Sequence, residues 1–182
     1  GAYNCFPDYK YLDLVFDFLK RKPEFIPTKH PKVRVFPKAR KLLLSWAIMG
    51  DLTHLAQTQE QQEIVIQSEI EQKGIYLVRY AKMLYQNQPD WLKRVFPLKR
   101  GFDIEDFPMD SIEWANGSKI LAIPQGEAKL NTLHPSAHFM DEAAFHEEGL
   151  GAYNSSVAAS SFIILVSSAH PGWFHDLVGE DR

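Results

Sequence analysis

The sequence predicts an α/β domain in which helices flank a mostly parallel sheet and an antiparallel hairpin is inserted. Short apolar, β-branched runs alternate along the chain with segments of helical periodicity. Asn116-Gly117, between two apolar runs, is a strong signal for a hairpin turn. The 182 residues suffice for one well-buried core and are few for two.

The N-terminal part is expected to be a helix and a connector. Residues 11–20 carry apolar side chains at helical spacing, and the prolines between residues 23 and 31 end that pattern. We therefore assign residues 1–32 to this helix and connector and residues 33–182 to the main domain.

The main domain is expected to begin with strand, helix, strand, helix. Residues 33–36 are predicted to form a strand, and residues 42–49 a helix that ends near Gly50. Residues 64–66 are a second strand, after which Ser68 and Glu71 form a capping-box pattern for a helix that reaches about residue 87.

The second half contains the hairpin and two more strands. Residues 111–115 and 118–123 are its two arms. Apolar strands then end at Met140 and Val166, and residues 147–160 can supply a helix between them. This alternation predicts the parallel sheet.

Charge and composition exclude some functions. A net charge of -3 excludes a uniformly basic surface for nucleic acid, although one segment is rich in cations that attract phosphate. These cations are Lys29, Lys32, Arg34, Lys38, Arg40 and Lys41. No apolar run approaches the roughly 18 residues of a membrane span. The single Cys5 suits an intracellular compartment, and a start at Gly1 without a signal pattern suggests a fragment.

The strongest chemical signal is Asp141-Glu142 at the end of an apolar strand. In a nucleotide-hydrolysing sheet, the first carboxylate can hold hydrated Mg²⁺ and the second can orient the attacking water. The alternative interpretation is a strand that runs into an acidic loop.

A basic turn follows the first strand, where a phosphate loop would have the pattern GxxxxGK[ST]. Leu43 and Leu44 occupy the glycine and lysine positions, and Ser45 occupies the position of the Mg²⁺-binding hydroxyl. The phosphate-binding charge could come from three cations of the same turn, Lys38, Arg40 and Lys41. The alternative interpretation is a basic turn that precedes an apolar helix and binds no phosphate. Small hydroxyl residues after the last strand can sense a γ-phosphate; the segment is Ser167, Ser168 and Ala169.

Together with residues 88–93 and 116–120, these segments occur in the order found in phage large terminase subunits. From about residue 33 onward the chain resembles their N-terminal ATPase domain. The resemblance implies a RecA/ASCE-type P-loop NTPase that hydrolyses ATP with Mg²⁺ and drives double-stranded DNA into a procapsid.

The resemblance also implies site roles. Asp141 and Ser45 would bind Mg²⁺, Glu142 would be the catalytic glutamate, and Arg40, followed by Lys38, would stabilise phosphate charge. Ser167, Ser168 and Ala169 would form the coupling motif. The deviant Walker A turn would bind the nucleotide and comprises Lys38, Ala39, Arg40, Lys41, Leu42, Leu43, Leu44, Ser45 and Trp46.

The implied partners are double-stranded DNA, a small terminase subunit, a portal protein and further copies in a ring. The implied location is the cytoplasm of a bacterial host, for a phage or prophage protein. Because the family's nuclease domain would follow Arg182, no nuclease activity is expected of this fragment. Two departures from the family are Leu44 at the lysine position and Asn131 where an arginine is common.

Three alternatives stay open. The chain could be a catalytically silent assembly or DNA-binding module of the same fold, as Leu43 and Leu44 suggest, or a helicase-like ATPase outside packaging. A histidine metal site would draw on the last third of the chain, but HExxH and CxxC spacings are missing there. Its members would be His134, His138, His146, His170 and His175.

In the ATPase interpretation, Phe25 or Phe36 could contact adenine.

Overall fold

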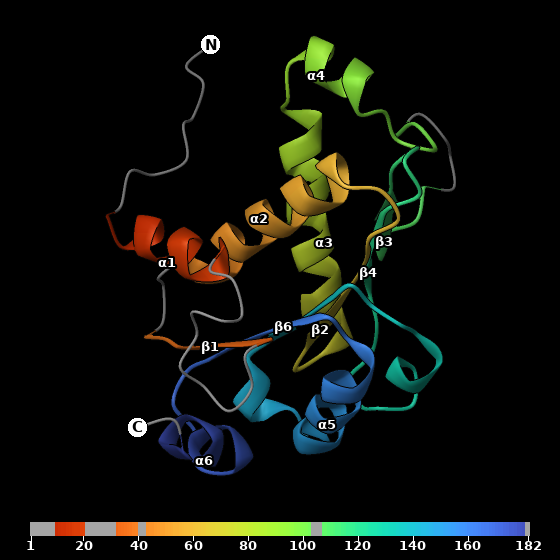
Figure 1. The fold of residues 1–182 in the computed structure, drawn as a ribbon. Helices are drawn as coiled ribbons and strands as arrows, with labels where there is room; N and C mark the ends of the chain where they lie inside the picture. Colours follow the sequence, from red (N-terminus) through yellow and green to blue (C-terminus); the bar gives the residue numbers. More distant parts are fainter. Residues whose placement is uncertain (1–9, 21–31, 40–42, 103–106, 181–182) are drawn as a thin grey trace.

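A six-stranded sheet with helices on both faces forms the protein, as the sequence predicts (Figure 1). The computed structural model describes residues 10–20, 32–39, 43–102 and 107–180. The strand order is β1-β6-β5-β2-β4-β3, in which β3 and β4 pair antiparallel and all other neighbours pair parallel. The strands are β1 (Val33–Pro37), β2 (Glu63–Ser68), β3 (Ser111–Glu113), β4 (Lys119–Ala122), β5 (Ala137–Asp141) and β6 (Phe162–Ser167).

The helices form two layers. α1 (Lys10–Lys20), α2 (Leu44–Thr58) and α3 (Glu71–Gln86) lie on one side of the sheet, and α5 (Gly149–Ala159) and α6 (Trp173–Glu180) lie on the other (Figure 1). A short α4 (Asp90–Val95) follows α3, and 3₁₀ turns occur at η2 (Leu130–Thr132) and η3 (Ala143–Phe145). None of the described helices is both long and apolar enough to cross a bilayer.

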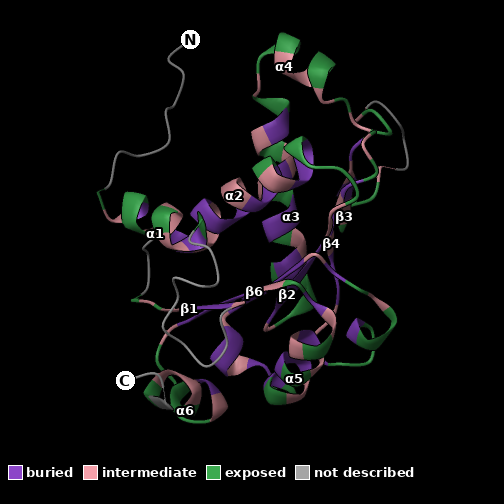
Figure 2. Cartoon of the chain, viewed as in Figure 1, coloured by how far each residue is buried: buried purple, intermediate pink, exposed green. Residues whose placement is uncertain are grey.

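The protein has a hydrophobic core on each face of the sheet, and successive side chains of the central strands point alternately into the two cores. Ile66 and Phe139 face the α2 and α3 side, whereas Val65 and Met140 face the α5 and α6 side. Burying each such side chain contributes roughly 1.5–3 kcal/mol. The central strands are accordingly buried from both sides (Figure 2), which explains their nearly continuous apolar runs.

The five parallel strands end at one edge of the sheet, here called the carboxyl edge. In register, Pro37 of β1 pairs with Ser167 of β6, and Asp141 of β5 pairs with Val166 of β6 and Ser68 of β2. β6 therefore lies between the strand before the basic turn and the strand that ends in the acidic pair. The residues after these strands converge at this edge.

Two local predictions are wrong. α2 does not end near Gly50 but continues to Thr58, because Leu52 and Ala56 extend its buried stripe and outweigh the roughly 1 kcal/mol penalty of a mid-helix glycine. Ser68 does not cap α3. It is the last residue of β2, and Ile70 occupies the N-cap position without a side-chain cap.

The predicted hairpin is confirmed and lies at the edge of the sheet, where β4 pairs parallel with β2. Gly117 has φ +84°, the left-handed conformation that its turn requires. Asn116 adds a contact that the turn pattern does not predict, because its side-chain amide donates to the carbonyl oxygens of Ala56, Gln57 and Gln59 at the end of α2.

α1 also belongs to the packed structure. Leu19 is buried in the core shared with α2, and Arg34 of β1 donates to the carbonyl of Phe18. The predicted connector falls mostly on residues 21–31, which lie outside the described residues. The boundary at residues 32 and 33 stays a prediction.

Candidate functional site

Side chains from β1, α2 and β5 meet at the carboxyl edge. The hydroxyl of Ser45, in the first turn of α2, donates to Oδ1 of Asp141 at 2.6 Å. Lys38, the residue after β1, brings its Nζ to 3.1 Å from Ser45 Oγ and 3.4 Å from Asp141 Oδ1. The structure therefore brings together three residues that the sequence assigns to one site.

Glu142 extends this group toward β6. Lys38 Nζ lies 3.4 Å from Glu142 Oε1, and the Ser168 hydroxyl lies 3.4 Å from Glu142 Oε2. Ser167, at the end of β6, accepts a hydrogen bond at 3.2 Å from the backbone N–H of Ala144 in η3. Both serines thus link the end of β6 to the segment that carries the acidic pair.

The backbone turns sharply at both ends of the site. Glu142 has φ 51° and ψ 41°, and Leu43 has φ 51° and ψ 14°. This left-handed region costs a side-chain-bearing residue roughly 1–2 kcal/mol. Leu43 stands at the glycine position of the phosphate-loop pattern, so the backbone there keeps a glycine-like conformation without a glycine.

Leu44, at the lysine position of the pattern, is only 6% exposed and belongs to the core under α2. A side chain in this orientation packs against apolar neighbours and not against the carboxylates. Lys38 reaches the acidic pair from the other end of the turn instead.

Among the described residues, three other predicted site residues are not brought into this group: Ala39, Ala169 and Trp46. Ala39 and Ala169 are exposed beyond the ends of β1 and β6. Trp46 packs edge-on against Tyr80 of α3, with ring centroids 6.0 Å apart. Arg40, Lys41 and Leu42, and Phe25 as an adenine contact, lie outside the described residues.

Phe36, the other adenine candidate, packs against the core and meets the Phe18 ring edge-on at 5.3 Å. The basic segment is likewise divided. Arg34 is buried between the rings of Phe18 and Phe162, and the Lys32 ammonium donates to the backbone carbonyls of Val157 and Ser160. Among its described members, Lys38 alone contacts the acidic pair.

Two histidines of the last third of the chain, His138 and His146, are buried, and one of them contacts a site residue. His146 Nε2 donates to the backbone oxygen of Asp141 at 3.0 Å, and burial is the main cause that lowers its pKa. His138 bonds the Ser156 hydroxyl, and burial lowers the pKa of His138 to about 3. The sequence singles out His146 only as a metal-ligand candidate, because no pattern signals a backbone carbonyl partner.

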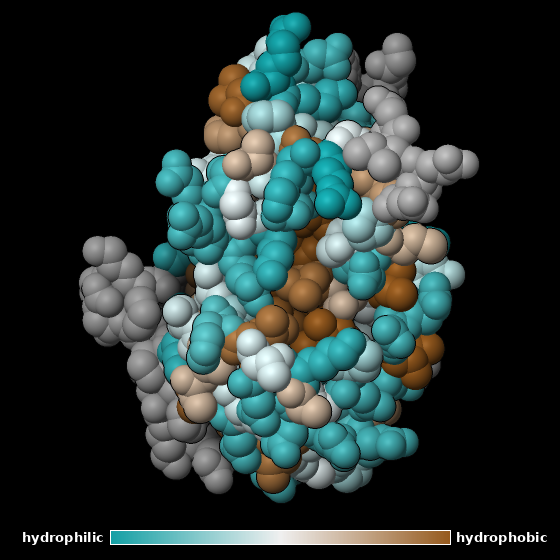
Figure 3. Space-filling view, turned by 90° about the vertical axis from the view of Figure 1, so that its right-hand side faces the viewer, coloured by the Kyte–Doolittle hydropathy of each residue, from teal (hydrophilic) through white to brown (hydrophobic). Residues whose placement is uncertain are grey.

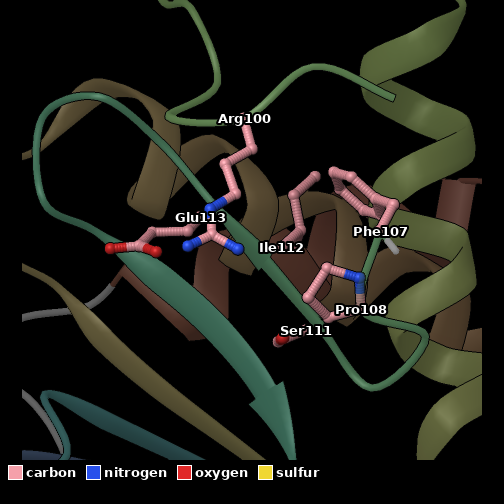
Figure 4. Close-up of a pocket in the computed structure, with 6 residues that line it drawn as sticks. All are labelled: Arg100, Phe107, Pro108, Ser111, Ile112 and Glu113. Atoms are coloured by element: carbon pink, nitrogen blue, oxygen red, sulfur yellow. The ribbon is translucent and has the colours of Figure 1, made fainter. Parts of the chain in front are cut away.

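Two surface hollows lie away from this group. One, of about 170 Å³, lies over β3, with Phe107 and Pro108 on one side and Arg100 and Glu113 on the other (Figure 4). The second hollow, of about 360 Å³, is lined by Glu127, Glu147, Glu148, Leu150, Gly151 and Trp173. Neither hollow contains Lys38, Ser45 or Asp141. On the face shown in Figure 3, hydrophobic residues gather in the middle, among hydrophilic ones.

The oxygen atoms at the carboxyl edge fit a magnesium ion. Mg²⁺ prefers a few hard oxygen ligands and keeps several waters, which suits the Ser45 hydroxyl and the Asp141 carboxylate. The Lys38 ammonium already lies among these oxygens, so the position attracts a cation. In the described part of the chain, no three His, Cys, Asp or Glu side chains group as metal ligands.

The sheet order and the two helix layers define an α/β domain with a mostly parallel sheet. Among solved structures, the chain is similar to the large terminase ATPase domain of Thermus phage P74-26, with 13% identity over 90% of this chain and 72% of that one and a TM-score of 0.53. It is also similar to the large terminase of a thermophilic bacteriophage in complex with ADP, with 13% identity over 96% of this chain and 44% of that one and a TM-score of 0.59.

These similarities confirm the resemblance at the level of the fold, which is that of phage large terminase ATPase domains. The chain spans less than half of the second of these proteins. No protein-family model and no curated protein matches the sequence.

Proposed function

We propose that this chain is the Mg²⁺-dependent ATPase module of a phage DNA-packaging terminase. The observation that carries the proposal is the contact of Lys38, Ser45, Asp141 and Glu142 at the carboxyl edge of a sheet with the terminase ATPase fold. Cation, hydroxyl and two carboxylates are the side chains that phosphoryl transfer needs in one place.

Binding would use the first three of these residues. Ser45 and Asp141 would hold Mg²⁺, which when bound neutralises charge on the phosphates. Lys38 would then bind phosphate oxygens from the same position where it now contacts the carboxylates. Arg40 stays our first choice for additional phosphate charge, as a proposal from the family resemblance.

Hydrolysis would depend on Glu142. Its carboxylate would orient the attacking water. Lys38 contacts one oxygen of this carboxylate and Ser168 contacts the other, and these two contacts would hold the carboxylate in place. Because Ser167 ends β6 and Ser168 follows it, a change at the phosphates would reach β6 through them. The contacts of Ser167 with the Ala144 N–H and of Ser168 with Glu142 support the assignment of these two serines to coupling. Ala169 stays in the proposed coupling motif from the family resemblance alone.

Nucleotide choice and partners rest on the terminase context. The similar large terminase was solved with ADP, which supports an adenine nucleotide here. Double-stranded DNA, a small terminase subunit, a portal protein and a ring of copies would be the partners, in the cytoplasm of the bacterial host.

ATP hydrolysis by the purified chain tests the proposal. Glu142→Ala should abolish Mg²⁺-dependent phosphate release while ATP binding is largely kept, because Glu142 acts on the water. Glu147→Ala, an exposed carboxylate in the following loop, is the matched control and should keep wild-type turnover.

A folded wild-type chain that binds ATP without turning it over would contradict hydrolysis and favour the catalytically silent assembly module. A wild-type chain that binds no nucleotide would overturn the nucleotide site itself.

A further inference from the structure

The hydroxyl of Ser68, the last residue of β2, is buried without a hydrogen-bond partner among the described residues. Ser68 is 0% exposed, and its Oγ is fully enclosed. Leaving a buried hydroxyl unpaired is costly, so a partner that binds from outside the protein is expected. The same residue fails as the cap of α3, which leaves its hydroxyl free for another role.

Register places this hydroxyl beside the acidic pair. Ser68 and Asp141 are direct partners across β2 and β5, so their side chains point to the same face of the sheet. That face carries α2, where Ser45 donates to Asp141. α3 covers Ser68 on the same face, since a Cβ on Gly74 would lie 4.0 Å from the Ser68 nitrogen.

Ser68 makes no direct hydrogen bond to Asp141, although the two are neighbours. When two neighbouring polar groups are too far apart for a direct hydrogen bond, a water molecule can bridge them. Magnesium keeps several of its waters when it binds to protein carboxylates. A hydrated ion held by Asp141 and Ser45 would therefore bring water to the unpaired hydroxyl.

We propose that Ser68 is a positioning residue of the metal site, whose Oγ holds a water of the hydrated Mg²⁺ bound by Ser45 and Asp141. This inference rests on the proposed function. It adds β2 to the strands that build the site, so four adjacent strands, β1, β6, β5 and β2, contribute to it.

The test is the Mg²⁺ dependence of ADP binding, measured by calorimetry for wild type and Ser68→Ala. The variant should need about fivefold more Mg²⁺ for half-maximal binding, the size of one lost hydrogen bond. ADP binding with a chelator present should not change. The free energy of unfolding of Ser68→Ala, measured in urea, should equal or exceed that of wild type, because the substitution removes an unpaired buried hydroxyl.

Ser160→Ala is the matched control. Ser160 is equally a buried serine whose hydroxyl lacks a partner among the described residues, but it precedes β6 and so lies at the opposite edge of the sheet. Its Mg²⁺ dependence should match that of wild type.

An unchanged Mg²⁺ requirement in Ser68→Ala, or an equal shift in Ser160→Ala, would overturn the role of Ser68 while leaving the ATPase proposal intact. Wild-type chain that binds no ADP, or binds it without regard to Mg²⁺, would instead overturn the proposed metal and nucleotide site, and the inference with it.

Discussion

At the scale of single residues, Lys38 matters most because one ammonium group faces two carboxylates. Its Nζ lies 3.4 Å from an oxygen of both Asp141 and Glu142, and its side chain is largely buried. Lys38→Met keeps most of the side-chain length but removes the charge, so the two carboxylates lose their cation. We expect ATP affinity to fall roughly 10- to 100-fold, the usual effect of losing hydrogen bonds to a charged group.

Fluorescent-nucleotide titration measures this loss. Lys99→Met is the control, because Lys99 pairs with Glu113 at the exposed hairpin, where an ion pair contributes little. Equal affinities of Lys38→Met and wild type would remove Lys38 from the site.

Leu43 allows a test of backbone strain in the phosphate turn. Leu43→Gly relieves the left-handed conformation at φ 51° but adds freedom to the unfolded chain. The net gain in the free energy of unfolding should be about 0–1 kcal/mol in urea denaturation. Leu43→Ala keeps the strain and should gain nothing. A gain in Leu43→Ala equal to that of Leu43→Gly would show that the exposed leucine side chain, and not the backbone, carries the effect.

At the scale of elements, Asn116 joins the hairpin to the end of α2 through its three carbonyl contacts. Asn116→Ala should lower the free energy of unfolding by about 1–3 kcal/mol, because the α2 carbonyls lose their donor. Asn131→Ala, at an exposed asparagine in η2, should change the free energy of unfolding by less than about 0.5 kcal/mol. Urea denaturation compares the two. Equal losses of stability in the two variants would contradict a stabilising role of the Asn116 contacts with the end of α2.

Most elements could be predicted because their periodicity is a local property. β5 and β6 are apolar runs of strand length, and the hairpin turn is set by Asn116-Gly117. Long-range packing decided the rest. The buried stripe carries α2 past Gly50, Phe18 and Phe162 enclose Arg34, and pairing with β5 keeps Ser68 in β2.

The candidate site shows the same division. Asp141 and Ser45 could be singled out by their place after a strand and before a helix. Lys38 could be named, but its approach to both carboxylates depends on the parallel register of β1, β6 and β5. The contact of His146 with the Asp141 carbonyl and the position of Ser68 beside Asp141 arise only once the strands are paired.

At the scale of the whole molecule, His138 predicts how stability depends on pH. Its pKa is lowered to about 3 in the folded state, whereas an unfolded histidine titrates near about 6.5. Between these values the unfolded chain binds a proton that the folded chain does not. The free energy of unfolding therefore decreases as pH falls from about 6.5 toward about 3.

Urea midpoints of wild type and His138→Gln across this range measure the effect. Carboxylates also titrate below about pH 5, so the difference between the two proteins isolates the histidine. His138→Gln should lose less stability on acidification. Parallel pH profiles would contradict the assignment of the effect to His138.

At the same scale, the strand order places Lys38, the acidic pair and the Ser167-Ser168 pair at one edge of the sheet, and the proposed function depends on this arrangement. A crystal structure with Mn²⁺ in place of Mg²⁺ and a non-hydrolysable ATP analogue tests this central claim most directly. We predict anomalous density for the metal within about 2.1–2.2 Å of Ser45 Oγ and an Asp141 oxygen, with Lys38 turned toward the phosphates. Nucleotide and metal bound elsewhere, with the Lys38, Ser45 and Asp141 contacts unchanged, would contradict it.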